Sequence, residues 1–397
     1  MRILIEAVRR NPYPLYTLMR RIAPVVQVRR GIWALFDHDS VTRALHDPET
    51  FSSRAAPPGG APLDWLIFLD PPRHSKLRAL VARTFTPRAI ANLEPRIEAI
   101  VHALLDATQA RGEMELVGEF AERLPTLVIL ELLGVPLDVA PRATRWSDAI
   151  IHLGDSIMGG ERAARAIATY RGAKEEMQAY LAPLLAARRA ELGDDLLSRL
   201  AMSEVDGERL SEAEIFDFFQ LLLLAGTETT TNLIANAVLC LLEHPAQLAV
   251  LRAEPGHVPA AIEEVLRFRS PVQMVFRTTL ADVTLRGRTI PAGQLVLTMV
   301  GSANRDSRQW VDANRFDIGR APQPHVGFGH GIHFCIGAAL ARMEARVAVT
   351  ALLQRTADWR RARRGAWTPR GGINVLGPQQ LAVKFTPCAW PGTVGDG

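Results

Sequence analysis

A single cysteine, Cys335, stands in a sequence context that suits a metal ligand better than a disulfide. It follows the glycine-rich run 328–334 and precedes an apolar stretch with helical spacing that begins near Gly337. Gly331 allows a positive φ just before the cysteine, and Gly337 removes a side chain that would strike a flat group lying over the loop. The following helix directs unpaired N–H groups and the positive end of its dipole at the sulfur, which favours a thiolate. Such a thiolate is an axial ligand for haem iron.

Two other interpretations of this run compete. A lone cysteine at a helix start is usually a buried structural residue, but glycines on both sides and His333 two positions earlier argue against that interpretation here. The alternation of Gly327, Gly329 and Gly331 is also typical of nucleotide loops. However, the third glycine of a G-x-G-x-x-G motif would fall at Phe334, and no Lys-Ser/Thr pair follows.

A block of polar residues interrupts the apolar helical pattern between Leu221 and Leu239. Ala225 and Gly226 are followed by Thr-Glu-Thr-Thr-Thr at 227–231. Both features are unfavourable in a helix. A mid-helix glycine costs about 1 kcal/mol relative to alanine, and a buried carboxylate needs partners or a shifted pKa. Residues that disfavour the local structure and occur together indicate a functional site. We expect a helix opened at Gly226, with a hydroxyl bonded back to a freed carbonyl and a groove for a small ligand. A threonine-capped helix end is the alternative, but the apolar pattern resumes after the block.

The cysteine run and the polar block, together with a third motif formed by Glu264 and Arg267, resemble the cytochrome P-450 family. Residues 328–342 match its haem-binding signature, Phe-x-x-Gly-x-His-x-Cys-x-Gly-x-x-Leu-Ala-Arg, at every specified position. Residues 225–229 resemble its oxygen-activation segment, and Glu264 with Arg267 resembles its Glu-x-x-Arg pair. The resemblance covers most of the chain, from about residue 12 to residue 385, with the motifs in the family's order.

The resemblance implies haem b (iron protoporphyrin IX) as the cofactor and Cys335 as the ligand of its iron. Thr229 would hold the activated oxygen by a hydrogen bond, and Glu228 would help to deliver protons through water. Glu264 and Arg267, with Arg315 as the third member, would form a buried charge network that supports the cysteine loop. The residues expected to contact the haem or its propionates are His74, Arg78, Ala225, Arg277, Phe328, Gly329, His333, Cys335 and Gly337.

The implied activity is that of a bacterial-type monooxygenase that hydroxylates or epoxidises an apolar small molecule with O2. The substrate class is a terpenoid, steroid, fatty acid or macrolide, in a pocket drawn from residues 54–67, 150–158, 221–229, 272–276 and 373–376. No flavin or iron–sulfur signature is present, so electrons would come from a ferredoxin and its NAD(P)H-dependent ferredoxin reductase. A peroxide-driven peroxygenase and a non-catalytic haem-based ligand sensor are the alternative functions.

Length and composition favour one large domain. Of the 397 residues, 48% are hydrophobic and 22% charged, as in a globular protein with a large core. The clusters of Pro and Gly are loop-sized, so we expect a single domain over 1–397, with a disordered tail from about residue 387. Helical patterns dominate and strands are few, which predicts an α-rich α+β fold with small segregated sheets. The expected helices are 95–109, 162–191, 211–243, 258–268 and 336–358, and the expected strands lie within 26–33, 281–299 and 381–385.

Charge and cysteine content exclude several other classes of protein. The net charge is +4, but the basic residues are mostly arginines spread along the chain, and the densest group, Arg360–Arg364, is interpreted as a solvated helix end, not a nucleic-acid site. No apolar run approaches the ~20 residues of a membrane span, so we expect a cytoplasmic protein that binds neither membrane nor nucleic acid. The three cysteines form no C-x-x-C pair, which argues against a disulfide framework and a zinc site.

Overall fold

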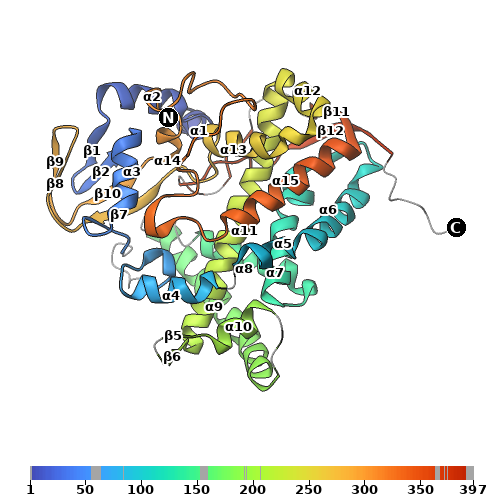
Figure 1. Cartoon of the computed structure of the whole chain (residues 1–397), viewed down its shortest axis with the longest axis horizontal. Helices are drawn as coiled ribbons and strands as arrows, with labels where there is room; N and C mark the ends of the chain where they lie inside the picture. The colour runs from blue at the N-terminus through green and yellow to red at the C-terminus, as the bar shows by residue number, and fades with distance from the viewer. Residues whose placement is uncertain are drawn as a thin grey trace.

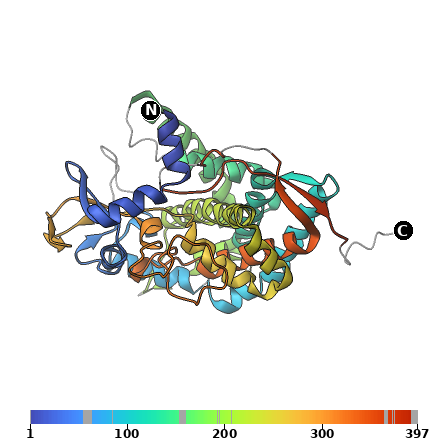
Figure 2. The same ribbon diagram turned by 90° about the horizontal axis from the view of Figure 1, so that it is seen from above.

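The structure, a computed structural model, describes residues 2–54, 64–83, 85–152, 160–191, 193, 195–205, 207–362, 367–370, 372 and 374–389. Helices make up most of it and pack around one long central helix, which Figure 2 shows crossing the middle of the molecule. The α-helices are α1 (Arg2–Arg10), α2 (Tyr13–Ile22), α3 (His38–His46), α4 (Arg73–Ala82), α5 (Pro87–Ala91), α6 (Glu94–Gln109), α7 (Arg123–Leu133), α8 (Ala140–His152), α9 (Gly160–Ala190), α10 (Leu196–Met202), α11 (Glu212–Glu243), α12 (Pro245–Ala253), α13 (Val258–Phe268), α14 (Val300–Ala303) and α15 (Ala338–Arg355).

The strands form small sheets that are separate from one another. The largest has the order β1-β2-β10-β7-β3, in which β10 runs parallel to β2 and antiparallel to β7; it lies on the left in Figure 1, away from β11 and β12. Its strands are β1 (Val25–Arg29), β2 (Ile32–Leu35), β3 (Phe51–Ser52), β7 (Val275–Thr279) and β10 (Leu295–Thr298). The other sheets are β11 (Thr356–Arg361) with β12 (Ala382–Pro387) and β4 (Glu113–Glu115), β5 (Glu204–Val205) with β6 (Glu208–Arg209), and β8 (Val283–Leu285) with β9 (Arg288–Ile290).

The central helix α11 begins with a capping box, because the Ser211 side chain accepts from the Glu214 N–H while the Glu214 side chain accepts from the Ser211 N–H. Its first half packs in one apolar cluster, with residues such as Phe219, and its second half in another, with residues such as Leu239. The polar block 227–231 lies between the two clusters. Charged and hydroxyl groups are therefore held inside the protein at the boundary of two cores.

The predicted opening of this helix at Gly226 is wrong. α11 is continuous from Glu212 to Glu243. A Cβ at Gly226 would lie 3.1 Å from Ile129 Cδ1 on α7, so glycine is present there because the two helices pack closely.

The expected α-rich α+β fold is confirmed, and α13 has the bounds that the sequence predicts. The last long helix differs, since α15 ends at Arg355 and residues 356–361 form β11, paired with β12. Arg360 and Arg361 are therefore strand residues and not a helix end, while residues 363 and 364 lie outside the described part.

Of the tail expected to be disordered from about residue 387, the structure describes residues 387–389. Pro387 pairs with Thr356 in the sheet, and the Cys388 N–H donates to the Arg355 carbonyl at 2.8 Å. Residues 390–397 lie outside the described residues. In the described part of the chain, no single helix is both long and apolar enough to cross a membrane; α11 and α12 meet the criteria of length and composition only as a pair, bent by 106°.

Candidate active site

The cysteine loop is shaped by two glycines with positive φ. Gly329 has a φ of +77° and Gly331 a φ of +71°, conformations that favour glycine. A Cβ on Gly331 would also lie 2.8 Å from the Leu45 carbonyl oxygen at the end of α3. The Cys335 N–H then donates to the Phe328 carbonyl at 2.9 Å, which closes the loop just before α15. The sequence predicted the positive φ at Gly331 but not the contact with α3.

The sulfur of Cys335 lies at the N-terminus of α15. Gly337 is the N-cap residue, and its backbone N–H donates to the sulfur. Cys335 is exposed, yet the surrounding atoms are close enough that burial raises the pKa of the thiol, against the lowering influence of the Gly337 N–H, Arg78 and Arg342. The helix end lowers the pKa of the thiol, as the sequence suggested, but burial outweighs that effect. A metal ion favours the thiolate, because it deprotonates a coordinating thiol.

Four basic side chains gather on one side of the loop, and none of them forms an ion pair with a carboxylate among the residues that the structure describes. His74 and Arg78 come from α4, Arg277 from β7 and His333 from the loop, and the rings of His74 and His333 lie 4.2 Å apart. Burial, together with His74, Arg277 and Arg78, lowers the pKa of His333 to about 3. Burial also lowers the pKa of Arg277 to about 10, although Asp70 acts in the opposite direction.

The hydrogen bonds of these four side chains are incomplete. Both ring nitrogens of His74 and Nε2 of His333 are buried without a partner. Arg277 donates to its neighbour's carbonyl, Phe276, at 2.8 Å, and Arg78 donates to the Phe334 carbonyl at 2.5 Å. Buried polar atoms without partners are rare and costly. The cluster is therefore suited to an anionic group held at this position.

The opposite wall of the site is a face of α11. Ala225 is exposed and Thr229 half-buried in the middle of a helix whose other residues are mostly buried. The Thr229 hydroxyl donates to the Ala225 carbonyl at 2.9 Å. Thr227 and Thr231 make the same backward bond, to Leu223 and Thr227 respectively, so the hydroxyls satisfy the helix locally.

Glu228 points away from that face. Its side chain is 7% exposed, and Oε1 is buried without a hydrogen-bond partner. It lines a small polar cavity with Ser147 and Asp148 of α8 and with Arg370. Burial raises the pKa of Glu228, Arg370 lowers it and Asp148 raises it. Sequence analysis identified Glu228 but not Asp148 or Arg370, because nothing in the spacing of residues 148, 228 and 370 indicates that they meet.

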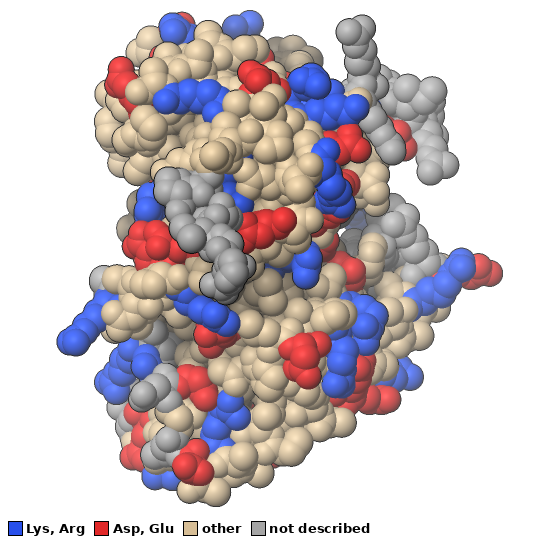
Figure 3. Space-filling view, turned by 90° about the vertical axis from the view of Figure 1, so that its right-hand side faces the viewer, with Lys and Arg blue, Asp and Glu red and all other residues tan. Residues whose placement is uncertain are grey.

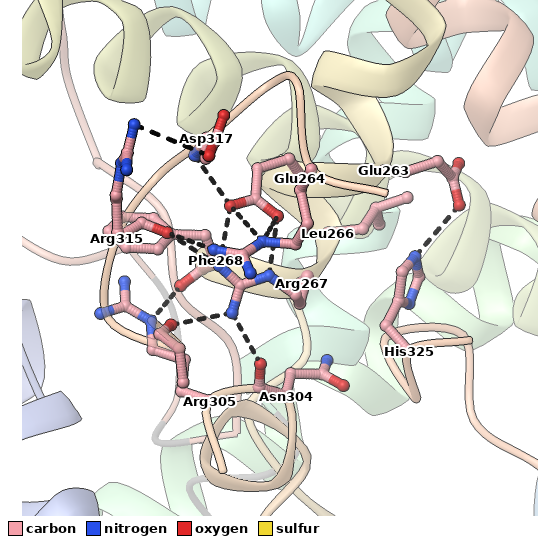
Figure 4. Close-up of polar contacts among 12 residues, drawn as sticks. Glu263, Glu264, Leu266, Arg267, Phe268, Asn304, Arg305, Arg315, Asp317 and His325 are labelled. Atoms are coloured by element: carbon pink, nitrogen blue, oxygen red, sulfur yellow. Dashed lines mark hydrogen bonds and ion pairs between the residues drawn. The ribbon is translucent and has the colours of Figure 1, made fainter. Parts of the chain in front are cut away.

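Behind the cysteine loop, Glu264 and Arg267 of α13 form a buried ion pair (Figure 4). Arg267 Nε and Nη2 each donate to Glu264 at 2.7 Å, and the remaining donors reach the backbone carbonyls of Asn304, Ala313 and Arg315. Every guanidinium N–H is thus used. Buried ion pairs are tolerated only when such extra hydrogen bonds are made.

The third side chain of this network is Arg320 and not Arg315. The Arg315 side chain is 64% exposed and lies 3.8 Å from Asp317, and only its carbonyl accepts from Arg267. Arg320 is 15% exposed and lies 3.3 Å from Glu264. Arg315 and Arg320 belong to the same loop, and only the path of that loop decides which of the two side chains turns toward Glu264.

The network holds the cysteine loop through short links. Asn304 accepts from Arg267 by its carbonyl and from the Val326 N–H by Oδ1, at 2.8 Å. Glu263 pairs with His325 at 3.1 Å and with Arg342 of α15 at 2.6 Å. Although burial acts to raise it, these two hydrogen bonds hold the pKa of Glu263 at about 2. The start and the end of the loop are therefore fixed to α13.

Phe328 and Arg342 complete the surroundings of the sulfur. The guanidinium carbon of Arg342 lies 4.5 Å from the centre of the half-buried Phe328 ring. Phe328 also meets the ring of Phe334 edge-on at 6.4 Å. The Phe328 ring is thus fixed by Arg342 and Phe334 within the loop that carries the cysteine.

Comparison with known proteins agrees with this geometry. A sequence model of the Cytochrome P450 family matches residues 163–356. A putative cytochrome P450, YjiB of Bacillus subtilis, is 41% identical over 345 residues, which cover 86% of this chain and 87% of that protein. This chain belongs to the cytochrome P450 family. It is also 41% identical to a vitamin D(3) 25-hydroxylase of Pseudonocardia autotrophica, over 85% of each chain.

A solved P450 has the same fold. CYP109E1 from Bacillus megaterium, in complex with corticosterone, superposes with a TM-score of 0.87 and is 36% identical, over 96% of this chain and all of that chain. Like its relatives, this P450 is a monooxygenase with haem b bound through a thiolate.

The residues present fit that cofactor. A Cβ on Gly337 would meet no atom within 4 Å, so nothing in the described part of the chain covers the glycine where a flat group would lie. The exposed Ala225 and Cys335 are equally uncovered by protein, and the orphaned nitrogens of His74 and His333 match the two propionates of a haem. Cys335 would hold the iron.

The expected substrate pocket is only partly described. Residues 55–63, 153–159, 371 and 373 lie outside the described residues. In the rest, Val272 pairs with Val375, and the Gln273 N–H donates to the Asn374 carbonyl at 2.8 Å. Two of the predicted wall segments are therefore held against each other.

Proposed function

We propose that this P450 hydroxylates or epoxidises a large apolar molecule, with steroid-like compounds the first class to test among terpenoids, steroids, fatty acids and macrolides. Two of its relatives support testing steroid-like compounds first, since one is named for vitamin D3 and another binds corticosterone. The observation that carries the proposal is the uncovered face of α11 at Ala225 and Thr229. The Thr229 hydroxyl lies in the middle of α11, and α15, the helix that follows Cys335, packs against α11.

Haem b, held by Cys335, would supply the redox chemistry by which one oxygen atom of O2 enters the substrate and the other leaves as water. The chain's own residues control the protons. The Thr229 hydroxyl, held by the Ala225 carbonyl, positions one hydrogen bond at the reacting side. Glu228 would hand protons toward that side from its buried carboxyl, whose pKa burial raises and Arg370 lowers.

The electrons would come from a ferredoxin and an NAD(P)H-dependent ferredoxin reductase. A basic surface near the cysteine loop suits an acidic carrier. Arg78 reaches that loop, and Arg83 and Arg88, at the end of α4 and in α5, are exposed nearby. On the side that carries β11 and β12, by contrast, positive and negative side chains are interspersed (Figure 3). We place the protein in the cytoplasm, where such carriers work.

Two other functions make different predictions. A peroxygenase would turn over with hydrogen peroxide alone, and a sensor would bind ligands without consuming NAD(P)H. The buried Glu228 beside Thr229 favours the monooxygenase, because an enzyme supplied with peroxide has less need of a proton donor at that position.

The test is a screen of steroids, fatty acids, terpenes and macrolides for a change in haem spin state, followed by turnover with a ferredoxin, its reductase and NAD(P)H. We expect a steroid-like compound to shift the spin state and to be oxygenated in proportion to the NAD(P)H consumed. Spin-state shifts without product would indicate the sensor. Product with peroxide only would indicate the peroxygenase.

A further inference from the structure

A small polar cavity lies on the far side of α11 from the exposed Ala225. It is enclosed by α7, α8, α11 and the segment around residue 370, and its volume of about 10 Å³ is close to the least that holds one water molecule. Most of its lining is polar, which a water molecule requires. The lining residues are Glu122, Thr126, Thr144, Ser147, Asp148, Ile151, Thr227, Glu228, Thr231 and Arg370.

The lining contains more acids than permanent cations. Three carboxyl groups, of Glu122, Asp148 and Glu228, line the cavity with a single guanidinium, that of Arg370. Arg370 forms an ion pair with Glu122. His152, at the end of α8, is the remaining titratable group that acts on Asp148 and Glu228. Since Arg370 is bound to Glu122, it cannot fully neutralise the other two carboxylates.

The two remaining acids differ in their access to solvent. Asp148 is exposed on α8, whereas Glu228 is 7% exposed. Both have raised pKa values, and burial is the first cause for each, because Asp148 lines the cavity even though the residue as a whole is exposed. Arg370 lowers the pKa of each, and a neighbouring carboxylate raises it. The hydroxyls of Ser147 and Thr227, which line the same cavity, lie 2.8 Å apart. The cavity thus brings together the exposed acid Asp148, a water-sized space and the buried acid Glu228, whose Oε1 has no hydrogen-bond partner among the described residues.

We propose that Asp148 is the entry point for protons that reach Glu228 through this cavity, and that Arg370 is the positioning residue that sets the charge of both. The inference deepens the function proposed above and depends on Glu228 being its proton donor.

The proton movement balances without a further reactant. When Glu228 gives its proton to the reacting side, its carboxylate takes one from the cavity water. That water takes the proton of the Asp148 carboxyl, and the Asp148 carboxylate takes one from solvent. Formation of one water molecule from O2 requires two protons, so the relay runs twice in each turnover, while the redox partners supply the two electrons.

The charge coupling can be tested without turnover, by infrared titration of the ferric holoenzyme. The carbonyl band of protonated Glu228 is assigned by its loss in Glu228→Gln. Asp148→Asn removes a neighbouring negative charge, so the midpoint of that band should move to lower pH. Arg370→Gln removes a positive charge, so it should move to higher pH, and Arg370→Lys should restore it toward wild type. Asp138→Asn, an exposed acid just before α8, should leave it in place.

Midpoints that are the same in wild type, Asp148→Asn and Arg370→Gln would overturn the proposed coupling. A midpoint that moves to higher pH in Asp148→Asn, or to lower pH in Arg370→Gln, would also overturn the proposed coupling.

Proton entry is then tested by turnover in H2O and D2O. With NAD(P)H and redox partners, Asp148→Asn should lower the rate of product formation and raise the solvent isotope effect, while Asp138→Asn should not. Peroxide-supported turnover of Asp148→Asn should equal wild type, because peroxide brings its own protons. If Glu228→Gln is impaired and Asp148→Asn is not, the entry point is elsewhere and the proposed function stands. If Glu228→Gln is itself unimpaired, the role given to Glu228 in the proposed function is wrong.

Discussion

Arg267 and Glu264 form two parallel hydrogen bonds of 2.7 Å, and their side chains are 2% and 4% exposed. The pair connects α13 to the loop that carries Cys335, because Asn304 accepts from Arg267 and also from the N–H of Val326. A change more than 60 residues before the cysteine should therefore affect the cysteine loop.

Glu264→Ala should lower stability and haem content together. It leaves Arg267 charged and unpaired in the interior, and breaking a buried pair in this way costs about 3–5 kcal/mol. The free energy of unfolding and the haem-to-protein ratio would be measured against wild type. Arg315→Ala is the matched control, with an expected loss below about 1 kcal/mol, since its side chain is exposed. Equal haem content and unfolding in Glu264→Ala and wild type would refute the structural role.

Thr229→Ala should uncouple NAD(P)H consumption from product formation. The helix can close without the hydroxyl, because its bond to the Ala225 carbonyl is local, but the hydrogen bond at the reacting side is lost. The product-to-NAD(P)H ratio should fall several-fold while hydrogen peroxide rises, and Thr229→Ser, which keeps a hydroxyl, should recover most of the ratio. An unchanged ratio in Thr229→Ala would direct attention to Thr227 or Thr230.

Arg277→Gln should speed haem loss. Arg277 is 7% exposed and forms no ion pair with a carboxylate in the described part of the chain, so we expect its charge to serve an anionic ligand such as a propionate. The rate of haem transfer to an excess of a haem-scavenging protein should rise about 10- to 100-fold, the loss expected for one hydrogen bond to a charged group. Arg88→Gln, at an exposed position on α5, is the control. A rate that does not change would mean that Arg277 does not hold a propionate.

Glu344 should make the protein less stable at high pH. It lies 2% exposed on α15 with Oε2 unpartnered, and burial raises its pKa well above 4.5. Below pH 4.5 the carboxyl is protonated in both folded and unfolded chains and imposes no penalty. As pH rises from 4.5 toward the folded pKa, only the unfolded chain ionises, so folding stability falls.

Glu344→Gln should remove this dependence. The variant should lose less stability than wild type between pH 5 and pH 8, as measured by chemical unfolding across that range. Glu98→Gln, at an exposed position on α6, should follow the wild-type curve. Parallel curves for wild type and Glu344→Gln would show that Glu344 is not held neutral.

The sequence predicted the parts of the fold that depend on local patterns. The bounds of α13 and the extent of α11, expected over 211–243, follow from helical spacing. β11 was missed because helical spacing continues past Arg355, while pairing with β12 decides the conformation of residues 356–361. Gly226 suggested an open helix, but it lies where α11 packs closely against Ile129, a residue of another helix.

In the site, too, residues within local motifs could be predicted, whereas contacts between distant segments could not. Cys335, Glu264 and Arg267 lie within short motifs, so their spacing identified them. Arg320 was missed in favour of Arg315 because only the path of the loop shows which arginine reaches Glu264. Asp148 and Arg370 belong to no motif and meet Glu228 only through the packing of the folded chain.

The reduced carbon monoxide adduct of wild type and Cys335→Ser tests the central claim most directly, which is that this one thiolate holds the iron. Wild type should show the red-shifted Soret band of a thiolate-ligated haem, and so should the control Cys388→Ser. Cys335→Ser should lose that band while still binding haem, because only the ligand changes. Retention of the red-shifted band by Cys335→Ser, or its loss in Cys388→Ser, would contradict the assignment of Cys335 as the ligand.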